Sequence, residues 1–115
     1  LDTSLLNSNT RITIGDECLF SADVEMHNSD GHPVKDLESG KIINVVRDIK
    51  IGDHCWIGQG ANILKNVELG HDVIVGRKAV VSKSFPQPNI AVAGNPARVI
   101  KENVTWEDDS FEYWG

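Results

Sequence analysis

The sequence lacks an excess of positive charge, a long apolar run and a large set of cysteines. It has 17 acidic residues and only 11 lysines and arginines, so its net charge is −6. No basic stripe is present that could hold a nucleic acid. No apolar run is long enough to span a bilayer, and there is no secretory signal pattern. We therefore expect one domain of 115 residues that neither binds nucleic acid nor inserts into a membrane.

What the sequence does contain is an aliphatic residue at every sixth position. The repeat includes Ile51, Ile57, Ile63, Leu69, Val75 and Val81, and glycine follows at Gly52, Gly58, Gly70 and Gly76. Small or β-branched residues stand three positions after each glycine site, at Cys55, Ala61, Val67, Val73 and Ala79. A helix repeats every 3.6 residues and a strand every two, so neither alone gives this pattern. It predicts short strands and turns stacked as a solenoid.

The repeat also occurs upstream, but out of frame. Ile14, Phe20 and Met26 keep the six-residue spacing, whereas Ile14 and Ile51 are 37 residues apart, one more than a multiple of six. The chain must therefore leave the repeat and return, and we expect an excursion loop at about residues 27–48. Within it, Asp30-Gly31-His32-Pro33 is typical of a turn. We expect the repeat domain to cover 1–101 and an acidic, aromatic tail to cover 102–115.

Both cysteines, Cys18 and Cys55, fall at the small, inward-pointing position of the repeat. We interpret them as buried free thiols in a reducing compartment, which predicts a cytoplasmic protein. A disulfide or a metal site formed by the pair is the less favoured alternative.

Several motifs together resemble the hexapeptide-repeat acyltransferases. They are Ile14-Gly15-Asp16, Gly31-His32-Pro33, the run from Ile51 to Gly58, and the run from Gly94 to Ile100. The resemblance implies an all-β fold, a left-handed parallel β-helix with one excursion loop and a short C-terminal tail. Within the family, the chain is most similar to the branch of galactoside, maltose and capsular-polysaccharide O-acetyltransferases.

That branch has a catalytic histidine in a His-Pro pair, which corresponds to His32-Pro33. The resemblance implies that His32 is the general base for direct transfer of acetyl from acetyl-CoA to a carbohydrate hydroxyl, without an acyl-enzyme. Asp30 is the nearest candidate to orient the histidine ring. The resemblance also implies a homotrimer with its sites between subunits.

The same resemblance suggests residues that bind the two substrates. An aromatic side chain at the position of Trp56 borders the site in this branch, although an outward tryptophan could equally pack against a neighbouring subunit. Contacts to coenzyme A are implied for Gln59, Arg77, Ser82, Lys83, Arg98 and Lys101. The cations among them suit the phosphates of coenzyme A. The alternative for Arg77 and Lys83 is that they are only solvent-exposed residues at corners of the solenoid.

Three other functions remain open. N-acetylation of an amino sugar or amino acid would use the same base. The γ-class carbonic anhydrases share the fold and bind zinc through histidines, and His27 and His32 are five residues apart. No third histidine is in register, so we expect no metal. A non-catalytic scaffold is the third alternative.

Overall fold

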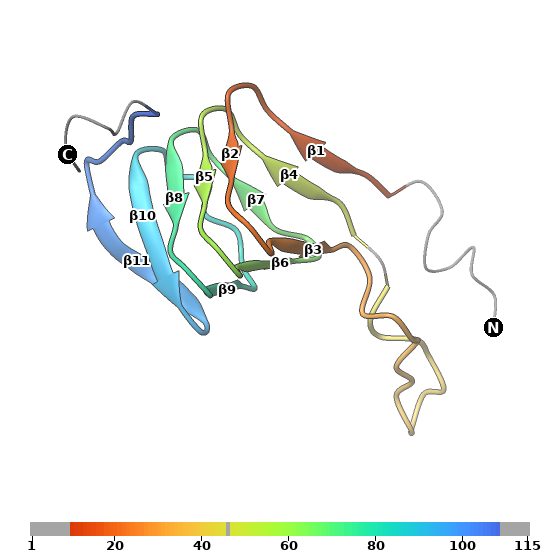
Figure 1. Ribbon diagram of the computed structural model, residues 1–115. Coiled ribbons are helices and arrows are strands. Elements are labelled where there is room, and N and C mark those ends of the chain that lie inside the picture. Colours follow the sequence, from red (N-terminus) through yellow and green to blue (C-terminus); the bar gives the residue numbers. More distant parts are fainter. Residues whose placement is uncertain (1–9, 46, 109–115) are drawn as a thin grey trace.

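The computed structural model describes residues 10–45 and 47–108, and these residues form strands and turns without a helix (Figure 1). No helical membrane span is therefore found among them. The strands are β1 (Ile12–Ile14), β2 (Leu19–Phe20), β3 (Glu25–His27), β4 (Ile49–Ile51), β5 (Trp56–Ile57), β6 (Asn62–Leu64), β7 (Glu68–Leu69), β8 (Val73–Val75), β9 (Val80–Val81), β10 (Ile90–Gly94) and β11 (Ala97–Glu102).

The strands stack into three sheets, which form the three faces of a coil. Their orders are β1-β4-β7, β2-β5-β8-β10-β11 and β3-β6-β9. All named pairings are parallel except the hairpin of β10 and β11. Three six-residue units complete one coil, because Ile51 lies beside Leu69 and Ile57 lies beside Val75. The predicted left-handed parallel β-helix is confirmed.

The repeat positions supply the core. Ile57, Ile63 and Cys55 are completely buried, as the inward positions require. In the first described coil Cys18, Phe20 and Met26 are only partly buried, because the other described coils cover them from one side. Both cysteines are free, but only Cys55 is buried, so the expectation of burial was wrong for Cys18. Burial raises the pKa of the Cys55 thiol to about 11, which keeps it protonated at neutral pH.

Glycine recurs because neighbouring coils approach closely at the corners. A Cβ built on Gly52 would lie 2.6 Å from the backbone of Gly70 in the next coil. The left-handed backbone conformation falls two residues later, on His54 (φ 54°) and Asp72 (φ 55°). Polar residues tolerate this conformation better than β-branched ones do. Equivalent corners therefore bring polar side chains of successive coils together.

The chain leaves the coil once between strands, at residues 28–48, and Figure 1 shows this segment as an arm that projects from the end of β3. We call it the excursion loop. A short antiparallel bridge joins Lys35 to Ile42 inside it. The sequence predicts the loop at about 27–48; in the structure β3 ends at His27 and β4 begins at Ile49.

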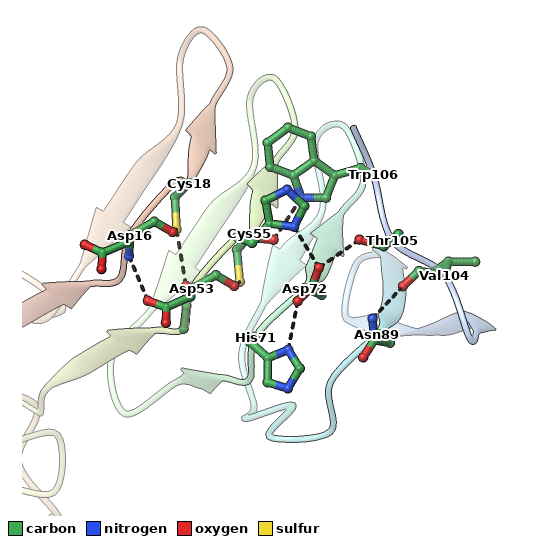
Figure 2. Close-up of polar contacts among 12 residues, drawn as sticks. Asp16, Cys18, Asp53, Cys55, His71, Asp72, Asn89, Val104, Thr105 and Trp106 are labelled. Atoms are coloured by element: carbon green, nitrogen blue, oxygen red, sulfur yellow. Dashed lines mark hydrogen bonds and ion pairs between the residues drawn. The ribbon is translucent and has the colours of Figure 1, made fainter. Parts of the chain in front are cut away.

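After β11 the chain turns back over the coil, and Asp72 holds it there (Figure 2). The Asp72 carboxylate accepts hydrogen bonds from the Thr105 hydroxyl at 2.7 Å and contacts Nδ1 of His54 at 2.7 Å and of His71 at 2.8 Å. Asn89 and Val104 exchange two further bonds. We call this set of contacts the clasp. The rest of the expected tail, residues 109–115, lies outside the described residues.

The clasp makes the free energy of unfolding depend on pH through the Asp72 carboxylate. Its hydrogen bonds, first from His71 and then from His54 and Thr105, lower the pKa of Asp72 from 3.8 to about 2. A lowered carboxyl pKa adds stability that is present above 3.8 and is lost as the pH falls toward about 2. The Asp72 side chain is 21% exposed, so solvent screens part of this effect.

We expect Asp72→Asn to lower the free energy of unfolding by about 1–2 kcal/mol near neutral pH. Urea denaturation across the acid range should show the difference from wild type shrinking as the wild-type carboxyl becomes protonated. Glu107→Gln, an exposed change in the same segment, is the control and should have no such effect. A difference that stays constant with pH would contradict the role assigned to the Asp72 charge.

Candidate active site

The excursion loop carries the predicted base, and Asn44 fixes the backbone beside it. The Asn44 amide is buried; it donates to the His32 carbonyl at 2.8 Å and to the Asp30 carboxylate at 3.0 Å. Its oxygen accepts from the backbone N–H of Val34. One buried side chain therefore holds the turn Asp30-Gly31-His32-Pro33 by three hydrogen bonds.

Asp30 contacts the coil rather than the histidine ring. Its carboxylate accepts a hydrogen bond from Nζ of Lys65 at 2.7 Å, and this bond lowers the pKa of Asp30 below its usual value. The His32 ring is exposed, and within the described part of the chain it has no hydrogen-bond partner. The expected Asp30–His32 contact is thus not formed in the single chain. Asp30 instead fastens the base of the loop to the corner after β6.

The second group of predicted residues meets on another face. Trp56 on β5 points outward, as expected, is 37% exposed, and donates from Nε1 to the Ser21 hydroxyl at 3.3 Å. It lines a hollow of about 310 Å³ with Gln59 and Arg77. Gly58 and Gly76 form part of its wall, at corners where the next coil approaches too closely for a side chain. The structure therefore brings together three of the residues predicted to bind substrates.

The remaining predicted residues lie elsewhere. Ser82 and Lys83 follow β9, where Nζ of Lys83 lies 5.4 Å from the centre of the Phe85 ring. Arg98 and Lys101 are exposed on β11, at the edge of the sheet that contains Trp56. A separate polar groove of about 420 Å³ beside β4 and β7 contains none of the predicted site residues. No hydrogen bond, ion pair or ring contact among the described residues joins His32 to Trp56.

Sequence reasoning missed the surroundings of Trp56. Trp106 packs beside it, with ring centroids 6.2 Å apart, and Ser21 binds its N–H from the preceding coil. His54 and His71 stand in turns of the coil, and the structure shows that both contact Asp72. The aromatic composition of the tail was the available signal for Trp106, but it did not say where the ring would pack.

Comparisons with known proteins agree with this geometry. Residues 48–83 match the family model described as bacterial transferase hexapeptide (six repeats). The chain is 48% identical over 95 residues to a polysialic acid O-acetyltransferase of Escherichia coli O1:K1, an alignment that covers 83% of this chain and 31% of the relative. The chain spans between about a third and a half of the curated relatives it matches.

Solved structures give the same result. The crystal structure of the polysialic acid O-acetyltransferase OatWY superposes with a TM-score of 0.85 at 35% identity, covering 96% of this chain and 57% of that one. Galactoside acetyltransferase in complex with coenzyme A gives a TM-score of 0.71 at 31% identity, covering 91% and 50%. The predicted resemblance to the hexapeptide-repeat acyltransferases is confirmed.

Proposed function

We propose that this protein transfers an acetyl group from acetyl-CoA to a hydroxyl of a saccharide. The relatives described above are O-acetyltransferases of a polysaccharide, and a similar structure holds coenzyme A. The observation that carries the proposal is the hollow lined by Trp56, Gln59 and Arg77. The same chain also exposes His32 on a loop whose backbone Asn44 holds by hydrogen bonds. An aromatic wall suits a sugar ring or a pantetheine arm, and nearby cations suit phosphates.

The chemistry needs one base and an open path to the thioester. A neutral His32 ring would take the proton of the saccharide hydroxyl as its oxygen attacks the acetyl carbonyl carbon. The tetrahedral intermediate would then collapse, the carbon–sulfur bond would break, and the thiolate of coenzyme A would leave and take up the proton. No acyl-enzyme is required, because the hydroxyl attacks the donor directly.

We propose that the base and the hollow of one active site come from different chains. The excursion loop projects away from the coil, and its side chains Leu37, Ile43 and Val34 are 97%, 64% and 49% exposed. Exposed aliphatic groups in a loop are often covered by a partner. We propose a homotrimer in which the loop of one subunit reaches the Trp56 face of another. We place the protein in the cytoplasm, which suits its two free thiols.

His32→Ala should reduce the turnover of acetyl-CoA with a saccharide acceptor by about 10²–10⁴-fold, the usual contribution of a general base. Release of the coenzyme A thiol measures the rate. Lys41→Ala is the matched control, because its side chain is exposed on the same loop. Full turnover in the His32 variant would rule out this mechanism.

A panel of saccharide hydroxyls and amino sugars, tested with wild type, separates O- from N-acetylation.

A second pair of variants tests what Asp30 does. If Asp30 acts by fastening the loop through Lys65, then Asp30→Asn and Lys65→Met should lower kcat by similar factors, about five- to twentyfold. The effects should not add in the double variant, because both changes break the same contact. If Asp30 orients the His32 ring directly in the assembled enzyme, Lys65→Met should leave kcat near wild type while Asp30→Asn does not.

A further inference from the structure

We propose that Trp106 is a positioning residue that holds Trp56 in place and thereby sets the affinity for acetyl-CoA. This inference rests on the proposed function, and it assigns a role to a segment outside the repeat. Trp106 follows Thr105, which the clasp binds to Asp72 (Figure 2). Its ring packs against the ring of Trp56. The steps below follow the contacts from the clasp to the hollow.

Trp106 is itself firmly held. Its side chain is only 9% exposed, its Nε1 donates to the His54 carbonyl at 2.8 Å, and its ring stacks on the His54 ring with centroids 4.3 Å apart and planes 10° apart. The backbone on its N-terminal side is fixed by the bond from Thr105 to Asp72 and by the bonds between Val104 and Asn89. A large aromatic side chain is thus immobilised at a corner of the coil.

Trp56, in contrast, has few constraints of its own. It is 37% exposed and stands outward from a two-residue strand. Its hydrogen bond to Ser21 is long at 3.3 Å and fixes only one edge of the indole. The Trp106 ring meets it at 6.2 Å with planes tilted by 49°, a favourable aromatic geometry. A pair of this kind supports a preference of about two- to tenfold for one arrangement.

The two rings also line neighbouring hollows. Trp56 lines the hollow that contains Gln59 and Arg77, whereas Trp106 lines one of about 360 Å³ with Leu19 and His54. Leu19 is the residue that pairs with Trp56 across β2 and β5. Trp106 therefore supports Trp56 from the side away from the predicted coenzyme A residues. Loss of that support should let Trp56 move within the hollow that it shares with those residues, and should weaken the binding of acetyl-CoA.

A double-mutant cycle tests this. Trp106→Ala should raise the KM for acetyl-CoA about three- to tenfold. In a Trp56→Ala background the same change should have almost no effect, because the ring that it positions is gone. Trp106→Phe keeps a packing ring and should stay within about twofold of wild type. An equal effect of Trp106→Ala in both backgrounds would overturn the proposal.

Two further measurements keep the proposal testable if Trp106→Ala does not fold. Thr105→Val retains the tryptophan but breaks the bond to Asp72. It should also raise the KM for acetyl-CoA, but only when Trp56 is present. Near-ultraviolet circular dichroism should show a coupled signal of the two indoles, lost equally in Trp56→Phe and Trp106→Phe. A wild-type protein without that signal would contradict the packing. Failure to acetylate any acceptor, with the signal intact, would overturn the proposed function instead.

Discussion

The structure depends on the hydrogen bonds between successive coils. Backbone groups pair directly across them, as in Gly52 N–H to Leu69 C=O at 2.9 Å and Gly58 N–H to Val75 C=O at 2.8 Å. This spacing leaves no room for a side chain at the corners, where a Cβ on Gly58 would lie 2.7 Å from the Val75 carbonyl oxygen. Extra residues therefore cannot be accommodated within a coil, and they must leave it as a loop.

The same pairing aligns side chains from distant parts of the sequence. Residues at equivalent positions stand one coil apart. This spacing places His54 against Asp72, and it places Trp56 against Ser21. The side chains that meet in this way come from different coils, not from the same six-residue unit. A solenoid of this kind builds a site by stacking, and each coil contributes one or two side chains to it.

The sequence predicted the features that obey the period and missed those that do not. The inward residues, the outward direction of Trp56 and the limits of the excursion loop followed from spacing, because stacking enforces the spacing. The partner of Asp30 did not, since Lys65 lies 35 residues away in a different coil. Trp106 was equally hidden, because a segment beyond the last strand has no period and its position depends on which carboxylate and carbonyl groups the corners leave available.

These two unpredicted contacts have the same physical form. The bond that Lys65 donates to Asp30 and the bond that Thr105 donates to Asp72 each join an irregular segment to a corner of the coil. The corners carry the polar groups of the coil that lie outside the sheets. Segments that leave the repeat can therefore form hydrogen bonds to them. Changes in such a segment can alter the position of His32 or Trp56 while the core stays the same. The coils thus supply the core and the side chains that line the Trp56 hollow, and the anchored segments add His32 and Trp106 to this framework.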